Sequence, residues 1–188
     1  MKPELSIIIP MLDERRTLPS LLENLASLES SATEIIFADG GSTDGSRKLV
    51  ARSGFRLLDA PRGRARQMNA GAASASGEVL LFLHADSRLP ENCETLIFSA
   101  LERESCAAGC FRLRFDTDHP LMKICAFMST FRVKRRQIAF GDQGIFVKKT
   151  LFCKLGGFPD IPLMEDYRFS EMLVRETKIA VADGFITT

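Results

Sequence analysis

The sequence predicts an α/β fold, a three-layer α/β/α sandwich built on a mainly parallel sheet. Short apolar runs of strand length alternate with helical patterns through the first half of the chain, which is typical of βαβ units. Loops rich in Asp, Ser and Gly follow these runs, as they do where parallel strands end. The 188 residues are 45% hydrophobic, which is enough for one buried core. We therefore expect a single domain over residues 1–188.

The first half contains the clearest alternation. Strands are expected at 5–9, 34–38, 55–58 and 79–83, and helices at 18–28, 47–52 and 64–75. The turn "DGGSTDGS" separates the second strand from the second helix. This order favours parallel pairing of the strands.

The second half is expected to contain a helix at 91–102, strands at 111–115 and 145–148, a helix at 166–175 and a last strand near the C-terminus. In the strand at 111–115, Phe111, Leu113 and Phe115 alternate with Arg112 and Arg114, which predicts one buried face and one exposed face.

An apolar helical stretch at 121–136 runs into a basic cluster. We interpret it first as a core helix followed by a solvated basic loop. The alternative is a surface that rests on anionic lipid or admits a lipid-linked acceptor.

Composition excludes several classes of protein. With 25 basic and 24 acidic residues the formal charge is +1, so nucleic acid is not expected as a partner. Five cysteines without a paired pattern are expected to be reduced core residues. The N-terminal apolar run is too short for a signal peptide, and no run of about 18 apolar residues predicts a membrane span. We expect a cytoplasmic protein, with peripheral contact at the inner face of the membrane as an open alternative.

Acidic residues follow three of the expected parallel strands. Asp13 and Glu14 follow the first strand, Asp39 ends the second, and Asp86 follows the fourth, two residues after His84. Because the carboxyl ends of parallel strands meet at one edge, we expect a single acidic crevice. Thr43, Asp44 and Ser46 are interpreted as turn and cap residues, whereas Asp39 and Asp86 are functional candidates.

The crevice also has basic residues. A hard cation, Mg²⁺ or Mn²⁺, would let acidic loops hold a phosphate, and Asp86 is the expected metal ligand. Arg62, Arg64 and Arg66 begin a helix where a diphosphate could meet guanidinium and N–H groups together, and Arg64 is favoured. Asn69 and Gly71 are expected to serve helix packing.

Two later motifs add polar residues. "GDQG" places Asp142 and Gln143 in a tight loop before a strand, and "LMEDY" places Glu165 and Asp166 at the start of a helix. At least one of the latter pair could simply cap the helix, and either could act as a general base.

Taken in order, these motifs resemble family 2 glycosyltransferases of the GT-A (nucleotide-diphospho-sugar transferase) fold. The resemblance extends from "SIIIPMLDE" through "FADGGSTDGS", "GRARQMNAGA" and "VLLFLHADSRLP" to "GDQGIFVKK" and "LMEDYRFSEML". It is greatest to a small bacterial subgroup associated with arsenosugar biosynthesis. The resemblance implies a nucleotide-sugar-binding part over about 1–90 and an acceptor-side part over about 91–188.

The resemblance also implies roles for particular residues. The expected donor-binding residues are Pro10, Asp13, Glu14, Asp39, Arg64 and His84. Asp86 would hold the divalent ion, Asp142 and Gln143 would face the acceptor, and Asp166, with Glu165 beside it, would be the catalytic base. The implied reaction is an inverting single displacement from a UDP- or GDP-sugar to an acceptor hydroxyl, the acceptor being a small molecule, a glycan or a lipid-linked molecule.

Two features depart from the family pattern. His84 stands where the metal-binding DxD motif has its first carboxylate, and the chain ends at "GFITT", before the basic or aromatic segment that would cover the donor, so we expect a lid to be missing. Both keep open a nucleotide-sugar-binding protein without catalysis. A sugar nucleotidyltransferase is less favoured, because "PMLDERR" lacks the glycine-rich phosphate loop expected after its first strand.

Overall fold

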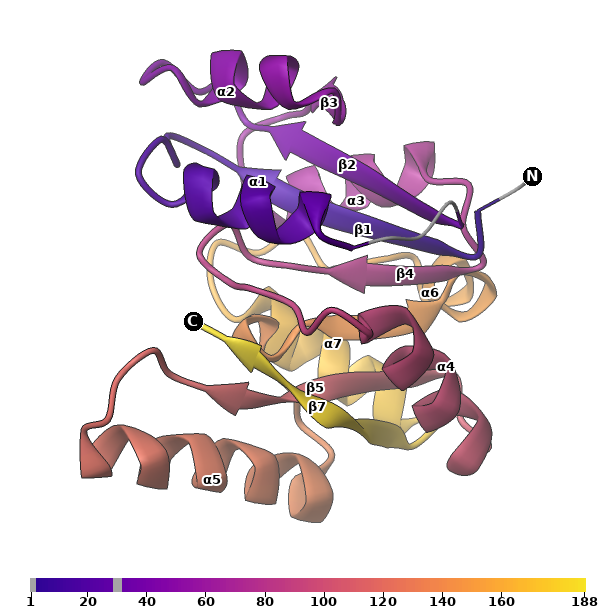
Figure 1. The fold of residues 1–188 in the computed structure, drawn as a ribbon. Coiled ribbons are helices and arrows are strands. Elements are labelled where there is room, and N and C mark those ends of the chain that lie inside the picture. The colour runs from indigo at the N-terminus through magenta and orange to yellow at the C-terminus, as the bar shows by residue number, and fades with distance from the viewer. Residues whose placement is uncertain (1–2, 29–31) are drawn as a thin grey trace.

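A computed structural model describes residues 3–28 and 32–188, and its strands form one sheet in the order β3-β2-β1-β4-β6-β5-β7 (Figure 1). The strands are β1 (Leu5–Met11), β2 (Thr33–Asp39), β3 (Arg56–Asp59), β4 (Val79–Phe82), β5 (Ala108–Arg114), β6 (Ile145–Lys148) and β7 (Ile179–Thr187). β6 pairs antiparallel with β4 and β5, and the other pairings among these strands are parallel. The prediction of a mainly parallel sheet is confirmed.

Helices cover both faces of the sheet. On one face lie α1 (Leu18–Ala26), α2 (Ser46–Ser53) and α4 (Cys93–Arg103), and on the other α3 (Arg64–Ser74), α6 (Lys149–Leu155) and α7 (Glu165–Val174) (Figure 1). Each helix layer packs its buried residues into a separate apolar cluster, one on each side of the sheet. The expected three-layer sandwich is therefore present.

Strand β1 explains how the two layers share one sheet. Leu5, Ile7 and Ile9 contribute to the cluster beneath α1, whereas Ile8 contributes to the cluster beneath α3. Gly71 of α3 lies so close to Ile8 that a Cβ at this position would be 2.5 Å from the Ile8 side chain. Small residues at this crossing let α3 approach the sheet, as predicted for Gly71.

Asn69 provides the second predicted packing contact of α3. Its side-chain amide donates to the carbonyl oxygen of Phe158 (2.8 Å) and accepts from the Phe158 N–H (2.9 Å). These two bonds fix the segment before α7 against α3, so Asn69 also serves packing.

The register brings polar loops from both halves of the chain to one edge of the sheet. Met11 is opposite Asp39, so β1 and β2 end level with each other. β6 runs in the opposite direction and begins at Ile145, opposite Phe82 where β4 ends. The loop before β6 therefore lies at the same edge as the loops after β1, β2 and β4.

The interpretation of 121–136 as a core helix followed by a loop is wrong. The segment forms one helix, α5 (Pro120–Arg136), in which Val133 is the one fully buried residue. The basic residues occupy its last turn, where cations complement the helix dipole. An apolar stripe in the sequence shows that one face of a helix is apolar. It does not show whether that face packs against the core.

The cysteines also differ in part from expectation. All five are free thiols, and Cys93, Cys106 and Cys110 are buried, but Cys125 and Cys153 are exposed. Burial raises the pKa of Cys93 to about 11 and that of Cys110 to about 12, which makes both inert at neutral pH.

Candidate functional site

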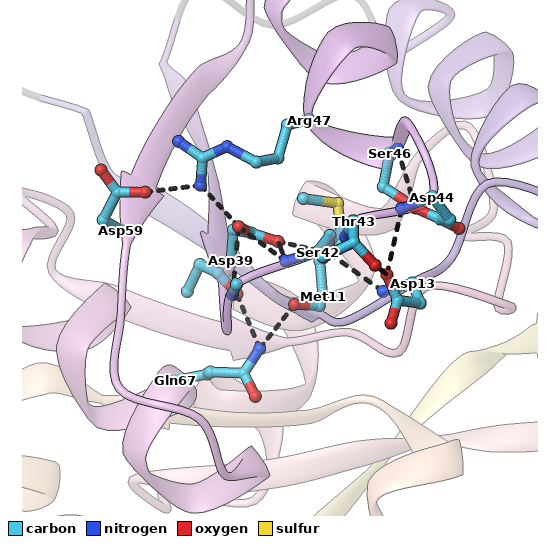
Figure 2. Close-up of polar contacts among 12 residues, drawn as sticks. Met11, Asp13, Asp39, Ser42, Thr43, Asp44, Ser46, Arg47, Asp59 and Gln67 are labelled. Atoms are coloured by element: carbon cyan, nitrogen blue, oxygen red, sulfur yellow. Dashed lines mark hydrogen bonds and ion pairs between the residues drawn. The ribbon is translucent and has the colours of Figure 1, made fainter.

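Asp39, the last residue of β2, lies at the centre of a hydrogen-bond network (Figure 2). Its side chain is fully buried and accepts hydrogen bonds from the N–H groups of Gly41 and Ser42 and from the Ser42 hydroxyl. Arg47 forms ion pairs with Asp39 and with the exposed Asp59. Burial raises the pKa of Asp39, but the hydrogen bonds from Ser42 and Arg47 outweigh burial and hold it below its usual value. In this arrangement Asp39 shapes the loop that follows β2.

The loop after β1 is hydrogen-bonded to the loop after β2 (Figure 2). The Asp13 carboxylate accepts from the N–H groups of Thr43 (2.7 Å) and Asp44 (3.3 Å), and the Arg15 N–H donates to Asp44 (2.9 Å). Asp44 also accepts from the Ser46 N–H at the start of α2. Asp44 therefore acts as the turn residue that its type favours, but Ser46 is not the cap of α2: Gly45 holds the N-cap position, and the Ser46 hydroxyl accepts from the Glu14 N–H (2.9 Å).

Gln67 of α3 is a site residue that the sequence analysis missed. Its buried amide nitrogen donates to the main-chain oxygens of Met11 (2.7 Å) and Ala38 (2.9 Å). It thus joins the ends of β1 and β2 beneath the two loops (Figure 2). The sequence does contain a signal for this role: Gln67 lies four positions before Gly71, so a polar side chain falls on the packed face of the helix.

A pocket of about 350 Å³ opens at this edge of the sheet. It brings together five of the predicted residues: Pro10, Glu14, Arg64, His84 and Asp86. Arg62, Gly63 and Gln67 line it as well. Asp13 and Asp39 do not line it, but lie in the loops that shape it.

The positive side of the pocket is the N-terminus of α3. Arg64 is the first residue of this helix, and its guanidinium is more than half exposed. Gly63 before it has φ +130, a conformation that only glycine adopts without strain. Arg66 points elsewhere and forms an ion pair with Asp160 at 2.9 Å. Of the three arginines, Arg62 and Arg64 remain available to an anion in the pocket.

His84 lies between the pocket and the loop before β6. A Cβ at Gly141 would collide with its Nε2 atom, so the loop packs directly on the ring. Burial lowers the pKa of His84, and nearby Arg64 lowers it further, against the opposing effect of Asp86 and Asp166. The imidazole is therefore neutral at pH 7, and each ring nitrogen can make one hydrogen bond.

Asp166 is fixed beside His84 by two main-chain groups. Its two oxygens accept hydrogen bonds from the N–H groups of Gly141 and Tyr167, each at 2.7 Å. The neighbouring Glu165 is buried, and its Oε1 lies 3.5 Å from Nη1 of Arg64. The first turn of α7 thus meets both the loop before β6 and the positive side of the pocket.

Asp142 and Gln143 have different surroundings in that loop. Gln143 is fully buried, and its amide accepts from Arg132 (2.8 Å) and donates to the Phe111 carbonyl (3.4 Å). Burial raises the pKa of Asp142, while Arg132 opposes the rise. In the described part of the chain, Asp142 Oδ1 is a buried atom without a hydrogen-bond partner.

The residues fit a divalent ion that is held largely by a substrate. Among residues 3–28 and 32–188 there is no group of three or more His, Cys, Asp or Glu side chains that could hold a metal by themselves. Asp86, however, is exposed at the pocket, with one long contact to the Ser87 hydroxyl (3.3 Å). Mg²⁺ and Mn²⁺ sites of this kind use one or two carboxylates together with phosphate oxygens.

The chain matches a known protein family. The family described as glycosyl transferase family 2 matches residues 6–153, which is more than half of the chain. The match includes the whole pocket and the loop before β6, and it ends before α7.

Curated relatives carry glycosyltransferase names. An uncharacterized glycosyltransferase of Haemophilus influenzae is 30% identical over 185 residues, which covers 92% of this chain and 62% of the relative. A PGL/p-HBAD biosynthesis glycosyltransferase of Mycobacterium bovis is 38% identical over 96 residues, 47% of this chain and 38% of the relative. The chain therefore spans less than two thirds of the length of these relatives.

Solved structures share the fold over the full chain. Staphylococcus aureus TarS 1-349 has a TM-score of 0.81 at 18% identity, covering 100% of this chain and 60% of TarS. The mannosyltransferase PcManGT of Pyrobaculum calidifontis, in complex with GDP-Man and Mn²⁺, has a TM-score of 0.76 at 21% identity, covering 100% of this chain and 57% of PcManGT. TarS has also been solved with UDP and with UDP-GlcNAc. This likeness confirms the expected fold type.

Proposed function

The chain belongs to glycosyl transferase family 2, and from this premise we propose that it transfers a sugar from a UDP- or GDP-sugar to an acceptor hydroxyl with inversion. One observation carries the proposal. Arg64, His84 and Asp86 line one pocket, and Asp166 is fixed near His84 by the loop before β6. These are the groups that a single displacement at a sugar diphosphate needs.

The donor would bind between the strand ends and α3. Its diphosphate would meet the Arg64 guanidinium and the free N–H groups at the start of α3, which together favour an anion. Its base would lie towards the loops shaped by Asp13 and Asp39, with Pro10 and Glu14 beside it. Uracil and guanine both offer an N–H to such loops, so UDP and GDP remain the two donor classes.

Asp86 would hold a divalent ion together with the donor's phosphate oxygens. When bound, the ion neutralises charge on the leaving diphosphate. His84 replaces one carboxylate of the expected pair, and its neutral imidazole suits a hydrogen bond to the ribose or phosphate better than it suits Mg²⁺. Asp86 alone is therefore the proposed protein ligand.

Asp166 would be the general base. As the acceptor oxygen forms its bond to the anomeric carbon, the bond from that carbon to the diphosphate oxygen breaks and the acceptor's proton moves to Asp166. Each carboxylate oxygen keeps a second lone pair after its bond to Gly141 or Tyr167. Glu165 would hold Arg64 in place rather than take the proton, because it is buried against that guanidinium.

The acceptor would approach past the loop before β6. No group among the described residues forms a hydrogen bond with the buried Oδ1 of Asp142, so an acceptor hydroxyl that donates to it would remove an unfavourable state of about 1–3 kcal/mol. Gln143, whose amide is occupied by Arg132 and Phe111, would support the loop from beneath. The acceptor itself is a small molecule, a glycan or a lipid-linked molecule.

A thermal-shift screen of UDP- and GDP-sugars with Mn²⁺ or Mg²⁺ would test the donor half of this proposal. We expect one donor to raise the melting temperature only when the ion is present, since binding to the folded state alone stabilises it. A coupled assay for released UDP or GDP then tests transfer, using slow hydrolysis of that donor in place of an unknown acceptor.

The two assays together separate the alternatives. Donor stabilisation without release of nucleoside diphosphate, even in the presence of candidate acceptors, would favour the binding protein without catalysis. Release of pyrophosphate from a nucleoside triphosphate and a sugar phosphate would favour a nucleotidyltransferase.

A further inference from the structure

Helix α5 presents its large apolar side chains outward. Five are exposed: Leu121 (64%), Ile124 (57%), Phe127 (68%), Met128 (52%) and Phe131 (45%). The side towards the sheet carries smaller residues, among them Ala126, Ser129 and Thr130, with Val133 fully buried. This is the reverse of an ordinary surface helix, whose apolar stripe faces the core.

The exposed side chains form a continuous patch. Positions 124, 127, 128 and 131 are three or four residues apart, so they lie next to one another along the helix. The rings of Phe127 and Phe131 are stacked, with centroids 6.5 Å apart. Contiguous exposed apolar surface of this kind marks a site of contact with a protein or a membrane.

The charge on helix α5 itself has one sign. Between His119 and Gly141 the sequence contains five basic residues, Lys123, Arg132, Lys134, Arg135 and Arg136, and no acidic residue. Lys134, Arg135 and Arg136 are exposed in the last turn of the helix. The partner of this surface must therefore accept apolar side chains and offer negative charge.

A groove of about 860 Å³ between α5 and the β5–β7 edge extends the same surface. Arg112 and Arg114 border it, with their guanidinium groups 5.8 and 4.3 Å from the ring centre of the exposed Phe185. Its two carboxylates are already engaged, Asp116 with Arg88 and Asp118 with Lys123. Arg112 is paired with Asp183 (2.7 Å), so Arg114 is the cation that continues this surface beyond the helix.

We propose that the outer face of α5 docks on the surface of an anionic lipid bilayer, with the helix parallel to the membrane. Its 17 residues span about 25 Å, so the helix can lie flat with its exposed apolar side chains at the headgroup boundary while its cations attract anionic lipid. None of the helices in the described part of the chain is long and apolar enough to cross a bilayer. This docking does not depend on the reaction proposed above.

A second copy of the chain fits the same surface less well. Two such faces packed together would bring Lys134, Arg135 and Arg136 of both copies close to one another, with no carboxylate on either helix to compensate. An anionic bilayer satisfies the apolar and the basic residues at once. Charge complementarity thus selects the membrane.

The docked surface is joined to the candidate site by one arginine. Arg132 lies on α5, donates to Gln143 (2.8 Å) in the loop before β6, and stacks on the Phe140 ring with 3.9 Å to its centroid. A bilayer held against α5 would therefore lie next to the loop that carries Asp142. Acceptors embedded in that bilayer would reach the site from this side.

Vesicle sedimentation of the full chain tests the proposal. We expect co-sedimentation with vesicles containing about a third anionic phospholipid, little with neutral vesicles, and loss of binding at high salt. Each basic residue at an anionic surface strengthens binding about fivefold, so Lys134→Ser/Arg135→Ser/Arg136→Ser should weaken partitioning about a hundredfold. Phe127→Gln/Phe131→Gln should weaken it to a similar extent by removing the apolar contact.

The matched control is Lys48→Ser/Arg52→Ser/Arg175→Ser, which removes three exposed cations outside α5 and should bind as the unmodified chain does. Unchanged thermal melting shows that each variant is folded. Absence of binding to anionic vesicles, or full binding by both α5 variants, would overturn the proposal. A dimer in sedimentation velocity that Phe127→Gln/Phe131→Gln dissociates, without vesicle binding, would assign the face to a second copy instead.

Discussion

The loops after β1 and β2 differ from the loop before β6 in how their carboxylates are satisfied. Asp13, Asp39 and Asp44 accept hydrogen bonds from neighbouring main-chain and hydroxyl groups, so their loops are organised without a ligand. In the loop before β6 and the first turn of α7, Asp142 Oδ1 and Glu165 Oε1 are buried without a hydrogen bond from the described residues. Under the function proposed above, the donor side is preformed, whereas the buried Asp142 oxygen is completed by what binds on the acceptor side; Glu165 Oε1 already lies 3.5 Å from Arg64 Nη1.

The largest expected effect is at Asp166, on the acceptor side of the proposed site. Asp166→Asn should lower kcat about a thousandfold, because proton removal by a positioned carboxylate accounts for roughly 10²–10⁴ in rate. Donor affinity should stay the same, since Asp166 does not line the donor pocket. The coupled assay and donor calorimetry measure the two quantities separately.

Asp160→Asn is the control for that change. Asp160 precedes the same helix but is exposed and paired with Arg66, so its loss should leave kcat unaltered. Retained turnover in Asp166→Asn would instead move the base to another carboxylate, with Glu165 the first to be examined.

Gly141→Ala should have the next largest effect. The added methyl group would collide with His84 Nε2 and lie 3.5 Å from Asp166 Oδ2, so the ring or the loop must move. A displacement of about 1 Å in a reacting group can cost about a hundredfold in kcat. Steady-state kinetics would show this, and an unchanged kcat at unchanged stability would mean that the loop does not position the base.

Substitutions in the loop network around Asp39 should change the free energy of unfolding. Asp39→Asn should lower the free energy of unfolding by about 2 kcal/mol, because it leaves Arg47 and several N–H donors without their charged partner. Asp59→Asn removes the other ion pair of Arg47 but at a carboxylate that is 82% exposed, so it should cost about 0.5 kcal/mol or less. Urea unfolding of the two variants compares them directly, and equal losses would contradict the preformed network.

The smallest expected effect is the pH dependence from His84. Its pKa in the folded chain lies below the ordinary value of 6.5 because of burial and Arg64, so the unfolded chain binds a proton first as pH falls. Stability is then fully present above pH 6.5 and declines below it. His84→Gln should flatten this decline in urea titrations, and an undiminished decline would contradict the assignment to His84.

Much of the fold could be predicted because a β-strand that is buried on both faces appears in the sequence as a short continuous run of apolar residues. The apolar run at 5–9 and the spaced leucines from Leu18 predicted the ends of β1 and α1 to within two residues. Helix α6 was missed because its seven residues are too few for a periodic pattern. The orientation of α5 could not be predicted, since it depends on which other elements happen to cover its apolar face.

The candidate site could be predicted where chemistry and strand ends coincide. His84 and Asp86 follow β4 directly, and the structure places both in one pocket with Arg64. The supporting contacts could not be predicted. The bond from Gln67 to Met11 and Ala38 depends on how α3 crosses the sheet, which no local pattern encodes.

Calorimetric titration of UDP and GDP tests the central claim, that Asp86 and a divalent ion hold the donor's diphosphate in this pocket, most directly. For the unmodified chain we predict tight binding of one nucleotide with Mn²⁺ and an affinity about ten- to a hundredfold lower in EDTA. Asp86→Asn should show the lower affinity under both conditions. Equal affinity in Mn²⁺ and in EDTA for both proteins would contradict the account.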